Sequence, residues 1–176
     1  MQVILVRHTR VALQKGICYG QTDVPVADTF EEEAAKTKVL LQAYAPFDKV
    51  YSSPLSRARL LASYCGYPDH ETDPRLMEMD MGQWEMRPYN ELTDEYARQW
   101  FEDYLHLPTP GGESFQDQRA RVEDFLQELS RQPYSKVAIF AHAGVLGCAA
   151  IYGGLYTETT AWDHLTDYGG LIEIAL

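Results

Sequence analysis

The sequence predicts an α/β fold in which helices cover a mostly parallel sheet. Two apolar runs with many β-branched residues, VILV (3–6) and KVAIF (136–140), are typical of strands buried on both faces. Between them lie segments whose apolar residues recur at helical spacing. Strands that alternate with helices in this way favour a parallel sheet layered with helices.

Two weaker segments complete the predicted sheet. DKVYSS (48–53) is a shorter strand candidate, and LIEIAL (171–176) alternates enough to form an edge strand.

Start and stop signals delimit the first two helices. One opens at Asp28, where Glu31 three residues later completes a capping-box pattern, and it runs to about Tyr44. The next begins at Ser53-Pro54, an N-cap followed by a proline at the first helical position, and Gly66 closes it.

Two more helices are predicted after a less regular stretch. Ser114 with Asp117 opens the third helix, and Gly144 to Tyr152 forms the fourth, closed by Gly153-Gly154. The intervening segment 76–112 is rich in Met, Trp, Tyr and acidic residues and lacks clear periodicity. We expect it to be an insertion of short helices and loops over one end of the sheet.

Composition narrows the possible classes of protein. A chain of 176 residues fits one domain, and its net charge of −11 argues against a nucleic-acid partner. No apolar run approaches membrane-spanning length, so no membrane partner is expected. The three cysteines are far apart and show no metal-ligand spacing, which indicates reduced thiols and a cytoplasmic location. The sequence leaves monomer and dimer open.

Cationic and imidazole side chains follow three of the predicted strands. The first strand leads into Arg7 and His8, the strand near residue 50 leads into a helix whose first turn carries Arg57, and the KVAIF run leads into His142. Ligands of open α/β sheets bind outside the carboxyl ends of the strands. We therefore expect these side chains to meet at one edge.

Phosphoryl transfer is the chemistry that suits this set. Two arginines provide forked donors for a phosphate dianion, and helix N-termini add N–H groups. One histidine can attack phosphorus through a neutral ring nitrogen, while the other, protonated, stabilises equatorial oxygens. The leaving alkoxide needs a proton, and Glu78, Asp80 and Glu85 are the candidate acids.

Five blocks of sequence match, in order, the pattern of a known enzyme family. They are VRHTR (6–10), SSPLSRARLLA (52–62), LMEMDMGQWEM (76–86), PGGES (110–114) and FAHAGVL (140–146). With this set the chain resembles the histidine phosphatase superfamily, also called the phosphoglycerate mutase-like family, over residues 3 to 148.

The resemblance implies a three-layer sandwich and a single histidine phosphatase domain over 1–176. It implies that His8 is the nucleophile and forms a phosphohistidine, and that Arg7, Arg57 and His142 bind the phosphoryl oxygens. Glu78 then protonates the leaving group and later acts as the base that activates water. Neither a metal nor another cofactor is implied.

Three positions depart from the family pattern. Thr9 stands where a glycine is usual, Arg10 replaces an acid, and Ala143 replaces a glycine beside His142. Glycine permits close backbone approach, so Thr9 either alters the packing of its loop or contributes its hydroxyl. We expect Thr9 and Ala143 both to contact the phosphate or the substrate.

One loop narrows the resemblance within the superfamily. GICYGQTDVPV (16–26), together with the RHT triplet, is similar to a subset of bacterial alpha-ribazole phosphatases, which remove the 5′-phosphate of a benzimidazole nucleotide in cobalamin biosynthesis. The resemblance implies that Gln21 and Thr22 hydrogen-bond the phosphate. Tyr19, Trp84 and Tyr89 either stack on a flat base or pack in the interior.

Alternatives stay open at this point. Within the superfamily these are a phosphoglycerate mutase and a broad-specificity phosphatase, and outside enzymes a catalytically silent module that binds phosphoesters. Other phosphatase signatures are missing from the sequence: no cysteine precedes an arginine by six positions, and no Asp-x-Asp pair, P-loop or HExxH motif occurs.

Overall fold

A five-stranded sheet with the order β3-β2-β4-β1-β5 forms the centre of the protein. The computed structural model describes the backbone of residues 1–176 and all side chains other than that of Trp162. β1, β2, β3 and β4 are parallel, and β5 pairs antiparallel with β1 at one edge, which confirms the mostly parallel sheet. The strands are β1 (Gln2–Arg7), β2 (Lys49–Ser52), β3 (Glu71–Thr72), β4 (Lys136–Ala141) and β5 (Leu171–Ala175).

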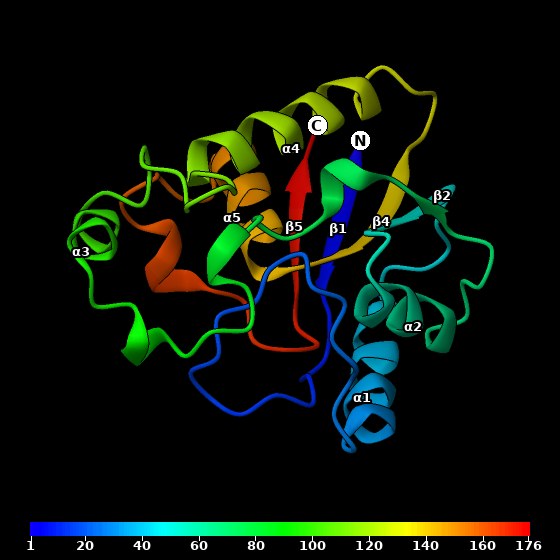
Figure 1. Ribbon diagram of the computed structural model, residues 1–176. Coiled ribbons are helices and arrows are strands. Elements are labelled where there is room, and N and C mark those ends of the chain that lie inside the picture. Colours follow the sequence, from blue (N-terminus) through cyan, green and yellow to red (C-terminus); the bar gives the residue numbers. More distant parts are fainter.

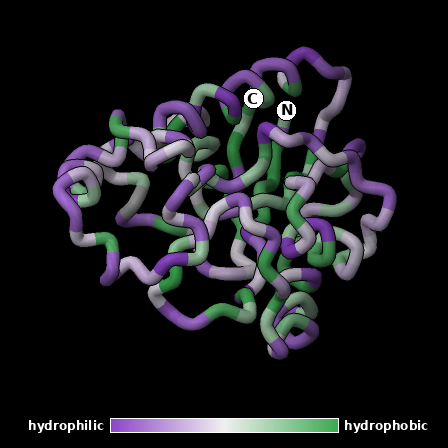
Figure 2. The backbone as a smooth tube through the Cα atoms, viewed as in Figure 1, coloured by the Kyte–Doolittle hydropathy of each residue, from purple (hydrophilic) through white to green (hydrophobic). Residues whose placement is uncertain are grey.

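Helices cover both faces of this sheet and complete a three-layer sandwich (Figure 1). Alternate residues of the central strands face opposite layers: Ile4 and Phe140 pack with α1 (Phe30–Gln42) and α2 (Ser56–Tyr64). Val3 and Ile139 pack with α4 (Phe115–Leu129) and α5 (Ala143–Tyr152). The strands are hydrophobic on both sides for this reason, and Figure 2 shows them as the green centre of the molecule.

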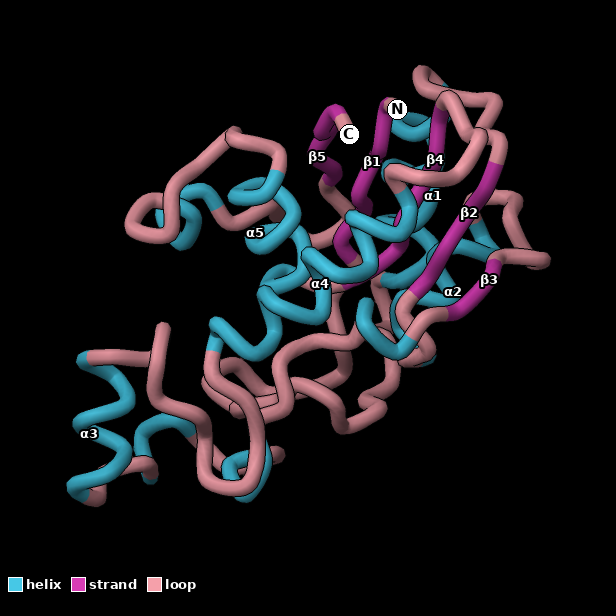
Figure 3. The backbone as a smooth tube through the Cα atoms, turned by 90° about the horizontal axis from the view of Figure 1, so that it is seen from above, coloured by secondary structure: helices cyan, strands magenta, loops and turns pink.

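The segment between β3 and α4 lies mostly beyond the sheet. It contains α3 (Glu95–Glu102), which stands away from the strands in Figure 3. Asp94 caps α3 by accepting the N–H of Ala97, and Trp100 is buried on its inner side. Short 3-10 turns occupy Pro74–Leu76, Gly82–Trp84, Tyr89–Glu91 and, before β5, Ala161–His164.

The capping box predicted for α4 is present and that for α1 is wrong. Ser114 and Asp117 cap α4 reciprocally, as expected. In α1 the N-cap is Thr29 and no side chain caps the helix. Asp28 has no such role because the helix begins one residue later than the capping box requires, which places Thr29 at the N-cap, where its hydroxyl donates to Glu33.

The start predicted for α2 is also wrong, by two residues. The helix begins at Ser56 after an extended N-cap at Leu55, although Gly66 follows its end with a positive φ as expected. Ser53 accepts the Leu55 N–H in a local turn, and its hydroxyl also contacts His142. A side chain engaged in this way belongs to the site and not to the helix cap.

Strand register brings the ends of β1, β4 and β2 to one edge. Arg7 pairs with Ala141, and Ser52 pairs with Phe140, so the residues that follow each strand are neighbours in space. The three cysteines are free and buried. Within the described chain, no helix combines the length and apolar character that crossing a bilayer requires.

Candidate active site

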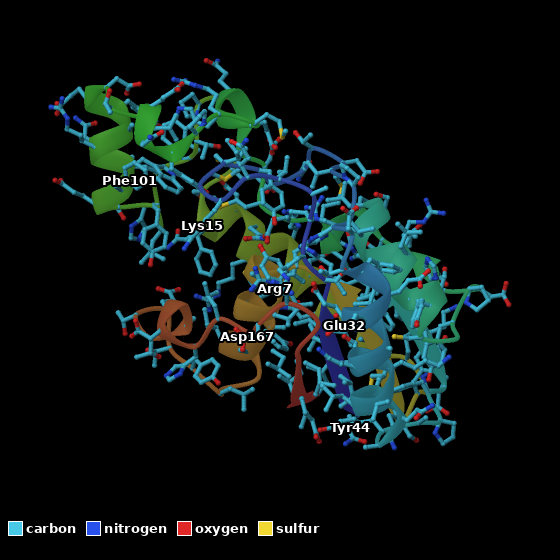
Figure 4. All side chains as sticks on the ribbon, turned by 90° about the horizontal axis from the view of Figure 1, so that it is seen from below. Arg7, Lys15, Glu32, Tyr44, Phe101 and Asp167 are labelled. Atoms are coloured by element: carbon cyan, nitrogen blue, oxygen red, sulfur yellow. The ribbon has the colours of Figure 1, made fainter. Side chains whose placement is uncertain are left out.

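Two histidines meet at the carboxyl edge of the sheet. His8 follows β1 and His142 follows β4, and their ring centroids lie 5.1 Å apart with an angle of 61° between the planes. Both are almost fully buried, at 3% and 0% exposure. Figure 4 looks onto this edge, where Arg7 lies near the centre between Lys15 and Asp167.

The tautomer of His8 follows from one contact. Its Nδ1 lies 2.7 Å from the carbonyl oxygen of Thr9, and a carbonyl can only accept a hydrogen bond, so Nδ1 carries the proton. Burial, and then the charges of Arg57 and Arg7, lower the pKa of His8 from 6.5 to about 3 despite the Thr9 contact. The ring is therefore neutral with a free lone pair on Nε2, the form that a nucleophile needs.

His142 is held from the other side by Ser53. Its Nε2 lies 2.8 Å from the Ser53 Oγ, and its Nδ1 is buried with no partner among the described residues. Burial, followed by the charges of Arg57 and His8, holds the pKa of His142 well below its ordinary value. The direction of this shift favours the neutral ring in this structure, and a protonated His142 during phosphoryl transfer stays a prediction.

Arg7 is oriented by the loop that precedes β5. Its Nη1 donates to the Thr166 carbonyl at 2.6 Å, and its guanidinium carbon lies 3.9 Å from the centre of the Tyr168 ring. Its Nε is buried and unpaired within the described structure. The Nε donor of Arg7 is therefore left for a ligand.

Arg57 lies in the first turn of α2, as predicted, and is fully buried. Its Nη1 donates to the Thr22 carbonyl at 3.0 Å and its Nη2 to the Gly20 carbonyl at 2.6 Å. Burial lowers the pKa of Arg57, which the acidic neighbours Glu78 and Asp23 only partly offset. Carbonyl dipoles satisfy the outer nitrogens, whereas Nε has no partner among the described groups.

Most of the unpaired buried polar side-chain atoms of the described chain therefore lie on His8's neighbours. Of six such side-chain atoms, four belong to residues at or beside His8: Arg7 Nε, Thr9 Oγ1, Arg57 Nε and His142 Nδ1. Buried polar groups in native proteins are almost always paired, so an unpaired set of this kind requires an explanation. Three nitrogens and a hydroxyl on residues near a neutral imidazole suit an oxyanion with several acceptors.

The structure separates the three candidate acids. Glu78 lines the cavity that contains His8, while Asp80 accepts the N–H of Gly82, the first residue of a 3-10 turn. Glu85 accepts the backbone N–H groups of the loop at 20–22. Of these three acids, Glu78 is therefore the one placed to reach a leaving group.

Glu85 fixes the loop at 20–22, whose carbonyls accept hydrogen bonds from Arg57. Burial would raise the pKa of Glu85, but hydrogen bonds from the Thr22 side chain and from the N–H groups of Gly20, Gln21 and Met81 outweigh it, so the pKa lies below its usual value. The side-chain amide of Gln21 donates to the Glu78 carbonyl at 3.2 Å. Gln21 and Thr22 thus support the site from behind in this structure, and their predicted contact with phosphate stays a prediction.

Gln118 and Gly144 are site residues that the sequence analysis missed. Gln118 is fully buried and donates its amide to Glu78 Oε1 at 2.8 Å, and the Gly144 N–H donates to Glu78 Oε2 at 3.2 Å. A Cβ on Gly144 would lie 2.4 Å from Glu78 Oε1. Gly144 belongs to the FAHAGVL block, which was the one available signal.

Arg121 is a third missed residue. It pairs with Glu113 at 2.7 Å and donates to the carbonyls of Arg75, Met77 and Glu78. A guanidinium with this many backbone acceptors fixes the segment that carries Glu78. Glu113 belongs to the PGGES block, but its partner could not be identified from the sequence.

Two cavities meet at Glu78, Tyr19 and Tyr89. The first, of about 560 Å³, contains Arg7 and His8 and extends past Arg10 and Lys15; we call it the polar cavity. The second, of about 390 Å³, is the apolar cavity, with walls that include Met79, Met81, Trp100 and Tyr104.

Of the three aromatic candidates for base stacking, two line the cavities and one is buried in the core. Tyr19 and Tyr89 line both cavities, and the Tyr19 hydroxyl lies 3.2 Å from that of Tyr168. Trp84 is buried in the core and packs edge-on against Trp100 at 5.2 Å. Packing is therefore the correct alternative for Trp84.

The remaining candidates lie at the same edge. Thr9 is fully buried, and Ala143 begins α5 and lines the apolar cavity. Arg10 points outward and pairs with Glu33 at 2.8 Å. Among the described side chains, no group of three His, Cys, Asp or Glu residues is placed to hold a metal ion.

Comparisons with known proteins agree with this geometry. The profile of the histidine phosphatase superfamily (branch 1) matches residues 3–175. The adenosylcobalamin/alpha-ribazole phosphatase of Salmonella typhimurium is 35% identical over 155 residues, which cover 83% of this chain and 76% of that protein.

Solved structures show the same fold. The alpha-ribazole phosphatase of Shigella flexneri superposes with a TM-score of 0.87 at 31% identity, over 100% of this chain and 91% of that one. A phosphoglycerate mutase from Thermus thermophilus has a TM-score of 0.77 at 25% identity, over 100% and 99%. With its motifs in order, its fold and its clustered histidines and arginines, the chain belongs to the histidine phosphatase superfamily.

Proposed function

We propose that this protein is a metal-independent phosphomonoesterase that hydrolyses alpha-ribazole 5′-phosphate to alpha-ribazole and phosphate, a step of cobalamin biosynthesis. Residues 1–176 act as one histidine phosphatase domain, with 76–112 as the insertion that covers its substrate side. The observation that carries the proposal is the neutral His8 whose neighbours Arg7, Arg57 and His142 each have a buried nitrogen without a partner among the described groups. The phosphatase relatives and the net charge of −11 support a small phosphate ester as substrate, rather than nucleic acid.

The first step is in-line transfer to His8. Its Nε2 lone pair attacks phosphorus while the bond from phosphorus to the ester oxygen breaks. Arg7 Nε, Arg57 Nε and His142 Nδ1 donate to the phosphoryl oxygens, since Ser53 can donate its hydroxyl to His142 Nε2 and leave the ring proton on Nδ1. Positive charge fixed before substrate arrives needs no rearrangement during the reaction.

Glu78 supplies the proton that the leaving oxygen needs. A protonated Glu78 transfers its proton as the ester bond breaks, so that the alcohol departs neutral. In the second step the Glu78 carboxylate takes a proton from water, the resulting hydroxide attacks phosphorus, and the bond to Nε2 breaks. Phosphate leaves, and His8 and Glu78 return to their starting forms.

Three contacts keep Glu78 in place for both steps. Gln118 and the Met79 N–H donate to Oε1, and the Gly144 N–H donates to Oε2. Gln118 is accordingly a positioning residue. The three buried free thiols support a cytoplasmic location for the enzyme.

The test compares three activities of the purified protein. We expect hydrolysis of alpha-ribazole 5′-phosphate by the parent, loss of that activity in His8→Ala, and no transfer between the oxygens of 3-phosphoglycerate at a comparable rate. Mutase turnover faster than hydrolysis would favour the mutase alternative. A folded parent that binds inorganic phosphate and hydrolyses no ester would favour the silent module.

A further inference from the structure

Two tyrosines from opposite ends of the chain share a hydrogen bond beside the nucleophile. The hydroxyl of Tyr19, in the loop that follows β1, lies 3.2 Å from the hydroxyl of Tyr168, in the loop that precedes β5. Both side chains line the polar cavity with His8, and neither takes part in the steps proposed for catalysis. We propose that this tyrosine pair positions Arg7 and Arg57 for the phosphoryl group and that its shared hydrogen bond couples the two arginines. The inference rests on the proposed phosphatase function, to which it adds two positioning residues.

Tyr168 packs against both Arg7 and the nucleophile. The guanidinium carbon of Arg7 lies 3.9 Å from the centre of the Tyr168 ring, which is close enough for a cation–π attraction. The same ring lies 5.6 Å from the ring of His8, at an angle of 54°. Because Arg7 Nη1 also donates to the Thr166 carbonyl, this carbonyl and the Tyr168 ring together fix the direction of the unpaired Nε.

Backbone contacts fix the loop of Tyr168 to the same edge of the sheet. The backbone N–H of Arg7 donates to the Gly170 carbonyl at 2.9 Å, and the Gly169 N–H donates to the His8 carbonyl at 3.1 Å. Tyr168 therefore extends from a backbone that is already held in place, and its ring can orient Arg7 instead of following it.

Tyr19 makes the equivalent contact with the second arginine. The guanidinium carbon of Arg57 lies 5.3 Å from the centre of the Tyr19 ring, and its Nη2 donates to the carbonyl of the next residue, Gly20. In both loops a tyrosine ring and a nearby carbonyl thus contact one guanidinium, whose Nε stays without a partner among the described groups.

The hydrogen bond of the tyrosine pair joins these two sets of contacts across 149 positions of sequence. Burial, followed by the contact with Tyr168, raises the pKa of Tyr19, although the charges of Arg57 and Arg7 oppose the shift. Tyr19 therefore keeps its proton at neutral pH, and one hydroxyl of the pair donates to the other. Donors that are fixed before the reaction stabilise developing charge most strongly, so a shift of either ring weakens the grip on one phosphoryl group.

The experiment measures binding of inorganic phosphate by calorimetric titration and hydrolysis of p-nitrophenyl phosphate. Tyr168→Leu removes the ring face from Arg7, and it should weaken phosphate binding about five- to 30-fold, as for a partly desolvated cation–π contact. The value of kcat/KM should fall by at least the same factor, because the same donors bind the transition state. In an Arg7→Met background, Tyr168→Leu should lower kcat/KM hardly any further, since no guanidinium remains to be positioned.

Two conservative variants test the coupling while the rings stay in place. Tyr19→Phe and Tyr168→Phe should each weaken phosphate binding about two- to fivefold, and the double variant should weaken it no further, because either change breaks the same hydrogen bond. Tyr96→Phe is the matched control: Tyr96 is 38% exposed, against 39% for Tyr168, its hydroxyl donates to the Pro108 carbonyl, and it lines neither cavity. This control should bind and hydrolyse as the parent does.

The outcomes separate the tyrosine pair from the function. Additive losses in Tyr19→Phe and Tyr168→Phe would show that the two hydroxyls act independently, and would overturn the coupling. An equal effect of Tyr168→Leu with and without the Arg7 side chain would overturn the positioning of Arg7, and it would leave the function standing as long as the parent hydrolyses esters. Coupled, non-additive losses of phosphate binding in a protein that hydrolyses no ester would support the pair and reject the function.

Discussion

Replacement of Gly144 by alanine tests how closely the acid must be positioned. The new Cβ would lie 2.4 Å from Glu78 Oε1 and 2.6 Å from Gln118 Oε1, whereas ordinary contact begins at 3.4 Å. The carboxylate must therefore retreat by about 1 Å, and a misplacement of that size can cost a catalytic step about 100-fold. Glu78 also activates water in the second step, which is common to all esters, so the part of the loss that depends on the ester should fall on protonation of the leaving oxygen.

The assay uses two leaving groups. On an alkyl ester such as ribose 5-phosphate, kcat of Gly144→Ala should fall about 100-fold, and on p-nitrophenyl phosphate it should fall much less, because p-nitrophenolate leaves without a proton. Gly147→Ala is the matched control: it lies one turn further along α5, and its Cβ would meet nothing within 4 Å. Both alanines favour the helix, so only the clash differs. Equal losses on the two esters, or none on the alkyl ester, would refute this reasoning.

Three further predictions follow from the same site. Glu78→Gln should lower kcat about 10²- to 10⁴-fold on alkyl esters and less on p-nitrophenyl phosphate, which needs Glu78 only as the base for water, and equal loss on both would contradict a role as acid. Added chelator should leave initial rates unchanged, so a loss that is restored by a divalent metal would reject the metal-free scheme. The His8 pKa is 6.5 in the unfolded chain and about 3 in the folded one, so only the unfolded chain takes up this proton between those values, and stability falls as the pH falls below 6.5. From about pH 6.5 to about pH 5 this costs about 2 kcal/mol, and urea unfolding of His8→Gln should lack that part of the pH dependence; identical pH dependence in parent and variant would contradict it.

Much of the architecture was predictable because it depends on local patterns. The buried runs that became β1 and β4 are apolar on both faces, and LIEIAL alternates because one face of the edge strand β5 is less buried. β3 could not be found, since its two residues, Glu71 and Thr72, are exposed and carry no apolar pattern.

The errors at helix starts have a physical cause in long-range contacts. Ser53 has the sequence of an N-cap, but its hydroxyl contacts His142, 89 positions away. At α1 the residue that turns back is Glu33, which is also paired with Arg10 from the first loop. Local propensity describes neither contact.

Some residues of the catalytic site could be predicted from the sequence, and others could not. Arg7, His8 and His142 could be placed together because parallel strands bring their ends to one edge. Gln118 could not be identified, because nothing in its local sequence distinguishes it from another polar residue of an amphipathic helix. Its partner Glu78 lies 40 positions earlier, and only the folded chain shows that the two meet.

Chemical trapping of the phosphoenzyme tests the central claim most directly. Rapid acid-free quenching during turnover of a ³²P-labelled ester, followed by peptide mapping under alkaline conditions, identifies both the residue and the ring nitrogen that carry phosphate. Because the Thr9 carbonyl holds the proton on Nδ1, the label should be found on Nε2 of His8 and should be missing from His8→Ala. Label on Nδ1, on another residue, or on no residue while turnover continues would contradict the account.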